Sequence, residues 1–326
     1  MKAIICEQFG LPETLRFGEL PDPIPGPNQV LIEVEACGVN FPDVLIIQNL
    51  YQFKPELPFS PGGEVAGRII EIGENVSDFK IGDSVLALCG WGGFAEKVAV
   101  DAERVFKLPP NLQAEIAATT LYTYGTSFHA LKDRAKLQEG ETLLVLGAAG
   151  GVGLAAVELG KLLGAKVIAA ASSEEKLSLC KEKGAELTIN YEKEDLKSRI
   201  KELTGGKGID VVCDPVGGKF TEPALRGMAW KGRYLIVGFA NGEIPKIPMN
   251  LPLLKGCSIV GVFWGQFSKL EPEKSFQNIA QLMQWVQDGK IQQHIGERFS
   301  LENSPKALRD ILDRKMLGKG VVIVKP

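Results

Sequence analysis

The chain has 326 residues, enough for two domains of ordinary size, and its balance of apolar and charged residues is typical of a globular protein. Its formal net charge is −3 without any run of basic residues, so we expect no nucleic-acid partner. No apolar segment reaches the length that spans a bilayer, and the first residues lack the layout of a signal peptide, so we expect no membrane association. The six cysteines show no Cys-x-x-Cys spacing, which favours free thiols in a reducing cytoplasm over a disulfide framework.

Residues 1 to about 120 predict short strands separated by turns. A proline-rich loop at 21–27 interrupts them, because proline fixes φ and removes a backbone donor. Many short strands at this spacing favour a compact β-rich domain or barrel. The expected strands are 3–6, 30–34, 65–72, 84–88 and 95–100.

From residue 142 onward the pattern changes to strands that alternate with helices. Before that point, residues 114–131 have a helical pattern that Gly125 interrupts, and after it one more helix is expected over 273–288. Six strands with intervening helices predict an α/β fold with a doubly wound parallel sheet. These strands are expected at 143–146, 166–171, 187–191, 210–214, 233–237 and 258–263. The last elements, including a strand at 320–324, are expected to return to the β-rich domain and make it discontinuous.

A glycine-rich turn, Gly-x-x-Gly-x-x-Gly, lies between the first two of these strands. Gly147 allows a tight exit from the strand, Gly150 allows backbone amides to approach a pyrophosphate, and Gly153 allows the helix to pack close to the sheet. The free amides and the dipole at a helix N-terminus favour an anion there. Because a strand precedes the turn and a helix and a second strand follow it, the turn predicts a dinucleotide site. The alternative is a glycine-rich turn that packs and binds nothing.

The end of the second strand indicates which dinucleotide binds. NAD-binding units usually carry an Asp or Glu there to hold the ribose hydroxyls, whereas this chain has Ala171, Ser172 and Ser173. A strand end without a carboxylate does not repel a 2′-phosphate, and hydroxyls together with Lys176 can bind one. We therefore predict NADPH rather than NADH. The alternative is that one of the serines only caps a helix and that Lys176 is a solvated side chain.

Five motifs along the chain match those of a known family. These motifs are Gly38-Val39-Asn40-Phe41-Pro42-Asp43, the run Pro61 to Gly67, Tyr124-Gly125-Thr126-Ser127, the turn Ala148 to Gly153, and Gly232-Arg233. With them, nearly the full length resembles the medium-chain dehydrogenase/reductase superfamily, and within it the zinc-free NADPH:quinone oxidoreductases related to zeta-crystallin. The resemblance implies a GroES-like catalytic domain over 1–121, a Rossmann NADPH-binding domain over 122–265 and a return to the catalytic domain over 266–326. It also implies a homodimer and a quinone or similar conjugated acceptor.

The resemblance also bears on metal binding. In the zinc-dependent alcohol dehydrogenases that share this fold, the first two ligands are a Cys at the position of Asn40 and a His at the position of Gly63. Neither residue here is a plausible zinc ligand, and only Cys89 lies where those enzymes have a four-cysteine structural zinc lobe. We therefore expect no metal. Without a Lewis acid an alkoxide product is poorly stabilised, so conjugated acceptors that spread the negative charge are favoured.

The family further implies roles for individual residues, each carried to a matching position. Asn40 and Tyr51 correspond to polar residues that line the substrate pocket and hydrogen-bond the acceptor carbonyl. The alternative for this pair is a structural amide and a surface tyrosine. The glycine turn includes Gly151 and Val152 as cofactor-binding residues. The positions that contact the nicotinamide side are Thr126, Gly238, Phe239, Ala240, Phe263 and Trp264, although aromatic residues there could instead pack in a core or an interface.

Lys176, Tyr191 and Arg314 match positions that surround the adenine ring or the 2′-phosphate in the family. The alternative for each is a solvated charge or a partly buried ring. Three other functions remain open on the sequence: a reductase of enoyl thioesters and other α,β-unsaturated carbonyls, a non-catalytic NADPH-binding structural protein, and a methyltransferase. The β-rich domain and the missing acid after the second strand count against the last of these.

Overall fold

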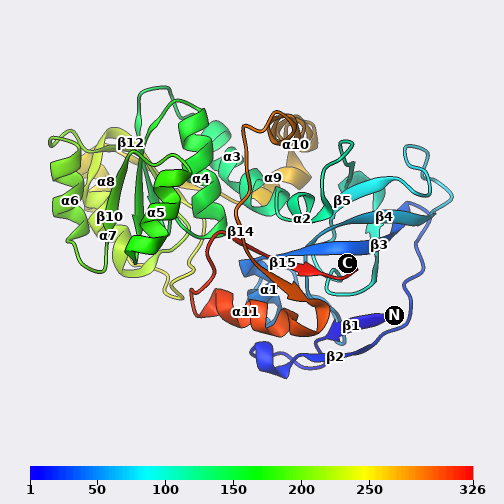
Figure 1. The fold of residues 1–326 in the computed structure, drawn as a ribbon. Coiled ribbons are helices and arrows are strands. Elements are labelled where there is room, and N and C mark those ends of the chain that lie inside the picture. Colours follow the sequence, from blue (N-terminus) through cyan, green and yellow to red (C-terminus); the bar gives the residue numbers. More distant parts are fainter. Residues whose placement is uncertain (326) are drawn as a thin grey trace. The chain divides into compact units, whose positions relative to one another are not determined.

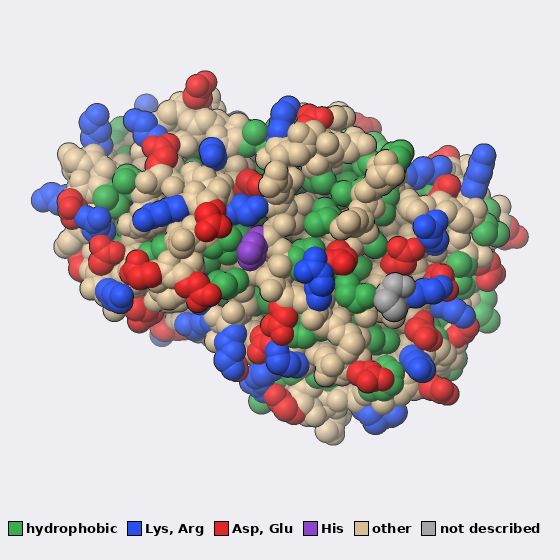
Figure 2. Space-filling model, viewed as in Figure 1, with side chains coloured by type: hydrophobic (Ala, Val, Ile, Leu, Met, Phe, Trp, Pro, Cys, Tyr) green, Lys and Arg blue, Asp and Glu red, His purple; other side chains and the backbone are tan. Residues whose placement is uncertain are grey.

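The computed structural model describes residues 1–325, which divide into two compact units (Figure 1). The first unit runs from Met1 to Tyr122 and resumes at Gln293, and the second unit is the continuous segment Thr123–Gln292. Within the described residues, none of the helices combines the length and the apolar composition that a bilayer crossing needs. In Figure 2, acidic and basic side chains are interspersed over the visible face of each unit, so that face carries no continuous basic patch.

The first unit is built on a seven-stranded sheet in which the order β14-β15-β3-β4-β5-β7 places the chain's last strands beside β3, while β6 also pairs with β3. The pairs are antiparallel except for β14 with β15. The seven strands of this sheet are β3 (Gln29–Val39), β4 (Glu64–Ile72), β5 (Ser84–Leu88), β6 (Lys97–Asp101), β7 (Val105–Lys107), β14 (Ile295–Ser300) and β15 (Lys319–Ile323). The first unit also contains a separate antiparallel pair that consists of β1 (Lys2–Ile5) and β2 (Arg16–Glu19). Its helices are η1 (Pro12–Thr14), α1 (Phe41–Ile47), η2 (Ala102–Arg104), α2 (Ala114–Ala117), η6 (Leu301–Asn303) and α11 (Ser304–Leu312).

The second unit contains a six-stranded, wholly parallel sheet in the order β10-β9-β8-β11-β12-β13, visible in green and yellow in Figure 1. Its strands are β8 (Thr142–Leu146), β9 (Lys166–Ala171), β10 (Leu187–Asn190), β11 (Ile209–Asp214), β12 (Met228–Ile236) and β13 (Ser258–Gly261). Its helices are α3 (Thr126–Phe128), η4 (His129–Arg134), α4 (Gly151–Leu162), α5 (Glu174–Glu182), α6 (Leu196–Leu203), η5 (Gly218–Phe220), α7 (Thr221–Arg226), α8 (Asn250–Lys255), α9 (Trp264–Leu270) and α10 (Pro272–Gln287). The predicted doubly wound sheet is confirmed, since this strand order reverses direction between β8 and β11.

Burial explains why these residues form this sheet. All four side chains from Leu143 to Leu146 are fully buried, as expected for a central parallel strand with helices on both faces. Leu144 and Leu146 belong to a core that includes Ile168, Val212 and Tyr234 from other strands of the sheet. The register pairs Val145 with Ala169 and Cys213, so the carboxyl ends of β8, β9 and β11 lie along one edge.

Two expectations from the sequence differ from the structure. The helical pattern over 114–131 is divided into α2, α3 and two π-helical segments, of which η3 covers Leu121–Gly125. The chain was expected to return to the β-rich domain at residue 266, but it returns to the first unit at Gln293, because α9 and α10 belong to the second unit. Trp264 covers Gly125, and the ring of Trp285 packs edge-on against Phe128. These two tryptophans, one in α9 and one in α10, hold both helices on residues 125–128 of the second unit.

Candidate active site

The glycine-rich turn joins β8 to α4, and its three glycines answer different physical requirements. Gly147 has a φ of +58°, a conformation that L side chains rarely adopt. A Cβ on Gly153 would lie 2.3 Å from the carbonyl oxygen of Gly147, so only glycine allows α4 to begin this close to the strand. Gly150 has an ordinary φ of −81°, and a Cβ on it would come no closer than 3.5 Å to another atom outside its chain neighbours. The fold therefore does not require glycine at 150, whereas a ligand approaching the backbone does.

The N-terminus of α4 is prepared for an anion. Gly150 is the N-cap residue, and no side chain in the described part of the chain accepts a hydrogen bond as its cap. The N–H groups of the first turn, including Gly151 and Val152, have no partner within the helix. The carbonyl of Val152 accepts a hydrogen bond from Ser127 Oγ at 2.8 Å, which ties the start of α4 to α3. A phosphate group would satisfy these amides and the helix dipole together.

Two serines and a lysine lie at the carboxyl end of β9. Ser173 Oγ accepts a hydrogen bond from the backbone N–H of Lys176 at 3.3 Å, so Ser173 is the N-cap of α5. Lys176 Nζ donates to Ser172 Oγ at 3.2 Å. The side chains of Ser172 and Lys176 are partly buried and therefore form a small cationic pair at this edge of the sheet. Their geometry suits a phosphate monoester, which accepts from both an ammonium and a hydroxyl.

Tyr191 follows β10 at the same edge. Its N–H donates to the carbonyl of Ala171 at 3.2 Å, and its ring packs against that of Phe220 with centroids 4.2 Å apart. Tyr191 therefore borders the strand end that carries Ser172, and part of its ring is covered by an aromatic neighbour. The packing and the binding interpretations of this residue are compatible, because a ring fixed on one face can present its other parts to a ligand.

The loop after β12 also lies at this edge. Ala240 N–H donates to Pro215 O at 3.1 Å, and Gly238 N–H donates to Asp214 O at 3.3 Å. A Cβ on Gly217 would lie 2.8 Å from Phe239, so that ring packs on the loop after β11. The carboxyl edge of one sheet thus collects the glycine turn, the β9 serine–lysine pair, Tyr191 and residues 238–240.

The remaining residues expected on the nicotinamide side are less uniform. Trp264 is buried, and a Cβ on Gly125 would come within 2.6 Å of its indole, so Trp264 packs in the interior of the second unit. Phe263 is 43% exposed, and Thr126 is partly buried at the start of α3. Arg314 is exposed with a φ of +58° and belongs to the first unit, so its expected place beside the 2′-phosphate stays a prediction.

Sequence reasoning missed Asp214, the last residue of β11. Its buried carboxylate accepts hydrogen bonds from the N–H groups of Val216 and Gly217, both at 2.8 Å, from Thr221 Oγ1 at 3.0 Å and from the Tyr234 hydroxyl at 2.6 Å. Burial, followed by the charge of Asp214, raises the pKa of Tyr234 well above its usual value. An acidic residue directly after the apolar run Val211 to Cys213 was the available signal.

The first unit contains a buried cluster of charged and polar side chains, which we call the β3–β4–β15 cluster: Asn40, Asp43, Glu64 and Lys319. Asn40 N–H donates to Asp43 Oδ2 at 2.7 Å, which fixes the start of α1. Glu64 Oε1 accepts the N–H groups of Leu121, at 2.5 Å, and Tyr122, at 3.1 Å. Lys319 Nζ donates to Val39 O at 3.0 Å and lies 3.5 Å from Glu64 Oε2. The cluster therefore connects the ends of three strands with Leu121 and Tyr122, the last residues before the chain enters the second unit.

The orientation of the Asn40 amide follows from its neighbours. Lys319 only donates, so the atom facing it at 2.5 Å is Oδ1, and Nδ2 therefore faces Gly38 O at 3.2 Å and Glu64 Oε2 at 3.3 Å. Asn40 is 5% exposed. Both amide hydrogens thus bind protein oxygens in this structure, through bonds longer than the usual 2.9–3.0 Å or so. Asn40 was predicted from the sequence, whereas Lys319 was not. Lys319 directly precedes the strand expected at 320–324, and its ammonium is the counter-charge of Glu64.

The residues around Gly63 do not form a zinc site. A Cβ on Gly63 would lie 2.8 Å from the hydroxyl of Tyr122, so that phenol fills the space of a side chain at 63. Burial raises the pKa of Cys89 to about 12, and Cys89 Sγ donates to Gly62 O at 3.3 Å. Within residues 1–325 no three His, Cys, Asp or Glu side chains are grouped so that they could hold a metal ion. An amide, a glycine and a carboxylate already paired with an ammonium do not provide the donors that zinc prefers.

Tyr51 lies in the loop after α1 and packs partly against the core of the first unit. Its ring meets Phe53 edge-on, with centroids 5.9 Å apart. Burial and the charge of Asp43 both raise the pKa of Tyr51, so its hydroxyl remains a hydrogen-bond donor at neutral pH.

Asp43 leads to a prediction about pH. Burial is the main cause that raises the pKa of Asp43 to about 7, against about 3.9 in an unfolded chain. Because the folded state keeps a proton that the unfolded state has lost, the free energy of unfolding should fall by about 1.4 kcal/mol per pH unit from this group between about pH 4 and pH 7. Asp43→Asn should remove that slope. Urea unfolding of both proteins across this range measures it.

The exposed Asp78→Asn variant is the control for this prediction, and its slope should match that of the parent. Burial also raises the pKa of Glu64, so the parent's slope contains more than one group and only the difference between variants isolates Asp43. Equal slopes in the parent and in Asp43→Asn would contradict the prediction.

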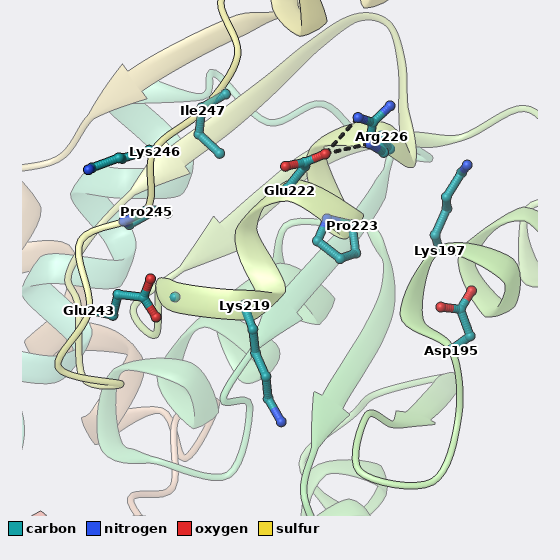
Figure 3. Close-up of a pocket in the computed structure, with 11 residues that line it drawn as sticks. Asp195, Lys197, Lys219, Glu222, Pro223, Arg226, Glu243, Pro245, Lys246 and Ile247 are labelled. Carbon is teal, nitrogen blue, oxygen red and sulfur yellow. Dashed lines mark hydrogen bonds and ion pairs between the residues drawn. The ribbon is translucent and has the colours of Figure 1, made fainter.

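A cavity of about 430 Å³ lies elsewhere in the second unit, bordered by α6, η5, α7 and the chain around Glu243 to Ile247 (Figure 3). Glu222 and Arg226 on its wall form an ion pair at 2.6 Å, and Lys197 and Lys246 extend from separate elements. No residue predicted from the sequence to bind substrate or cofactor lines this cavity. The candidate cofactor-binding residues therefore lie along the strand edge of the second unit, and the first unit contains the candidate acceptor residue Asn40 within the β3–β4–β15 cluster.

Comparison with known proteins agrees with this geometry. The family model described as "Alcohol dehydrogenase GroES-like domain" matches residues 26–110, and that described as "Zinc-binding dehydrogenase" matches residues 151–287. A quinone oxidoreductase-like protein 2 homolog from Nematostella vectensis is 40% identical over 99% of this chain and 89% of its own length. A mycobacterial protein solved in complex with NADPH is 31% identical, with a TM-score of 0.93 over 99% of this chain and 100% of the other.

The quinone oxidoreductase of Escherichia coli, also solved in complex with NADPH, is 28% identical and has a TM-score of 0.94 over 99% of this chain and 100% of its own. The wording of the second family model includes zinc, whereas the donor set described above does not fit it. The parallel sheet with its glycine turn, the β-rich unit and these full-length similarities agree. The chain belongs to the quinone oxidoreductase branch of the medium-chain dehydrogenase/reductase superfamily.

Proposed function

We propose that this protein is an NADPH-dependent oxidoreductase that transfers a hydride to a quinone or a similar conjugated carbonyl compound without a metal ion. The observation that carries the proposal is the start of α4, which no side chain of the described chain caps and where Gly150 leaves room for a ligand. Relatives named quinone oxidoreductases and two related structures that contain NADPH support it.

The cofactor site follows from the strand edge. The amides of Gly151 and Val152 bind the pyrophosphate, and the Ser172–Lys176 pair binds the 2′-phosphate. Tyr191 borders the adenine. The residues proposed to flank the nicotinamide are Thr126, Gly238, Phe239, Ala240, Phe263 and Trp264. When bound, NADPH supplies the hydride.

The acceptor site follows from the first unit. Asn40 exchanges one of its long bonds, to Gly38 O or Glu64 Oε2, for a bond to the acceptor oxygen, and Tyr51 donates from its hydroxyl. No metal stabilises the developing negative charge, so the acceptor must spread that charge over its own conjugated system. The hydride carries two electrons and one hydrogen, and a proton from solvent completes the quinol.

An acceptor panel tests this function. Loss of NADPH absorbance should be fast with phenanthrenequinone and slower with crotonyl-CoA. With ethanol and NADP⁺, no formation of NADPH should be detected. Faster turnover with crotonyl-CoA would replace the quinone by an enoyl substrate. NADPH binding without consumption by any acceptor would indicate a non-catalytic protein. Stoichiometric zinc or rapid ethanol oxidation would contradict the metal-free mechanism.

Lys176 gives a prediction about cofactor choice. In Lys176→Ala the 2′-phosphate loses a charge-assisted hydrogen bond worth about 1.5–3 kcal/mol, so the Kd for NADPH should rise roughly tenfold to a hundredfold. The Kd for NADH, which has no such phosphate, should stay unchanged. Fluorescence titration measures both. The matched control is Lys166→Ala, because Lys166 is an exposed lysine at the opposite end of β9. A parent protein that binds NADH as tightly as NADPH would contradict the 2′-phosphate assignment.

The free edge of the parallel sheet supports a homodimer. β13 is the last strand of the sheet, and its Ile259 is 38% exposed, while Trp230 and Leu253 of the same unit are also exposed. Unpaired strand edges with apolar side chains pair readily, and an antiparallel pair of two β13 strands is self-complementary about a two-fold axis.

We also propose a reducing, cytoplasmic location, because all six cysteines are free thiols.

Ile259→Lys tests the dimer. A lysine on the edge should block the pairing of strands, so the variant should sediment as a monomer while the parent sediments as a dimer. Glu103→Lys, a change at an exposed position of the first unit, should leave the parent's oligomeric state unchanged. A parent that is monomeric at micromolar concentration would contradict the proposal.

A further inference from the structure

Asp214 lies at the point where the parallel sheet reverses its winding. β11 neighbours β8, which leads into the glycine turn, and β12, which leads into the 238–240 loop. In sheets of this kind ligands bind outside the carboxyl ends of the strands at such a point. Asp214 is the residue that ends β11 there, and it is 3% exposed.

The four hydrogen bonds to Asp214 shape the next three residues. Two of the donors are consecutive backbone amides, of Val216 and Gly217, so the carboxylate folds the chain back over the end of its own strand. The other two donors, Thr221 on α7 and Tyr234 on β12, hold the carboxylate itself in place. A buried carboxylate with four donors is fully satisfied without a cation.

The folded-back segment supports the loops on both sides. Val216 lies against the glycine turn, because a Cβ on Gly147 would be 2.6 Å from its Cγ2. On the other side, Pro215 O and Val216 O accept the N–H groups of Ala240 and Asn241 at 3.1 and 2.9 Å. One side chain thus sets the spacing between the turn proposed for the pyrophosphate and the loop proposed for the nicotinamide.

We propose that Asp214 is a positioning residue for the nicotinamide half of the cofactor site. This inference rests on the proposed function, since it concerns how the same NADPH is held. Asp214 acts through Val216, Gly217 and the 238–240 loop and does not touch the reacting atoms. It is therefore expected to affect ligands that contain nicotinamide and to spare ligands that end at the second ribose.

The experiment compares two ligands, NADPH and 2′-phospho-ADP-ribose, which lacks only the nicotinamide. In Asp214→Ala two buried amides lose their acceptor, and the Kd for NADPH should rise roughly tenfold or more while the Kd for 2′-phospho-ADP-ribose changes less than about threefold. Asp214→Asn should restore most of the NADPH affinity. Its oxygen accepts from the two amides, and its NH₂ donates to the hydroxyls of Thr221 and Tyr234, which can accept.

Asp210→Ala is the matched control. Asp210 lies on the same strand, and its carboxylate accepts Thr142 N–H at 2.8 Å, at the opposite end of the sheet. Both ligands should bind this variant as they bind the parent. If Asp214→Ala does not fold, Asp214→Glu keeps the charge, displaces it by one methylene and should show the same selective loss of NADPH affinity.

The outcomes separate the inference from the function on which it rests. Equal weakening of both ligands in a folded Asp214 variant, or no weakening of either, would overturn the positioning role while leaving NADPH binding intact. A parent protein that binds neither ligand would overturn the proposed function itself. Selective loss in the Ala and Glu variants, with recovery in the Asn variant, supports the inference.

Discussion

Lys319→Met is expected to destabilise the first unit by about 3–5 kcal/mol, because removing one partner of a buried ion pair leaves the other charge uncompensated. The charge left behind is Glu64, which has no exposed surface. Burial already opposes the charge on both partners: it raises the pKa of Glu64 and lowers that of Lys319, and each partner's charge acts against the other's shift. Methionine replaces most of the aliphatic part of the lysine side chain and is one atom shorter, so the loss comes mainly from the missing charge and its hydrogen bonds to Val39 O and Asn40 Oδ1. Urea unfolding measures the effect.

Hydrogen exchange shows in which unit Lys319→Met reduces stability. Protection should fall in peptides from β3, β4 and β15 and remain in those from the second unit, which contains none of the cluster's residues. Lys325→Met is the matched control, since Lys325 forms a surface pair with Glu33 at 2.9 Å and exposed pairs contribute about 0–1 kcal/mol.

A double-mutant cycle with Glu64→Gln completes this test. The neutral glutamine side chain no longer needs a counter-charge, so the double variant should be more stable than Lys319→Met alone. A Lys319→Met protein as stable as the parent would show that the Lys319 charge does not support the cluster.

Gly153→Ala is expected to have the second large effect, because the added Cβ would meet backbone atoms rather than a flexible side chain. Gly147 O would be 2.3 Å away and Ala148 Cα 2.8 Å away, so the start of α4 must move. Overpacking of this kind costs about 1–3 kcal/mol. Because the helix amides move with it, one or two charge-assisted bonds to the pyrophosphate are lost, and the Kd for NADPH should rise roughly tenfold to a hundredfold.

Gly150→Ala separates folding from binding. Its Cβ would make only an ordinary contact with Gly147 O, at 3.5 Å, so the free energy of unfolding should change by less than about 1 kcal/mol, within the range for an N-cap change. The methyl group nevertheless stands where the pyrophosphate approaches, so NADPH binding should weaken. Thermal unfolding and cofactor titration of both variants distinguish the two roles. Unchanged NADPH affinity in both variants would place the cofactor elsewhere.

The sequence predicted the second unit better than the first, for a physical reason. Strands buried on both faces leave continuous apolar runs such as 143–146, and glycines mark the turn, so six parallel strands and their order of appearance are visible in the chain. In the first unit β2, β7 and β14 are short or exposed, and α1 and α11 were not predicted. The three strands have too few apolar residues to show a period, and α1 is only seven residues long, whereas α11 does carry apolar residues at helical spacing, at 307, 308, 311 and 312.

The candidate site was predictable where a motif is local. Gly147, Gly150, Gly153, Ser172 and Lys176 lie close together in the chain, and local patterns indicate their neighbourhood. Glu64 lies 24 residues and Lys319 lies 279 residues beyond Asn40, so only the pairing of β3 with β4 and β15 brings the three together. The four donors of Asp214 likewise come from the loop after β11, from α7 and from β12, and their roles do not show in any local pattern.

The discontinuity of the first unit determines the order in which the protein can assemble during synthesis. The second unit is one uninterrupted segment, so a nascent chain that has emerged past Gln292 already contains every strand of the parallel sheet. The first unit lacks β14 and β15 until residues 295–323 have been synthesised, and until then residues 36–39 of β3 lack their β15 partner and Glu64 lacks the Lys319 ammonium. All segments of the second unit are therefore synthesised before the first unit is complete, although the first unit begins earlier in the sequence.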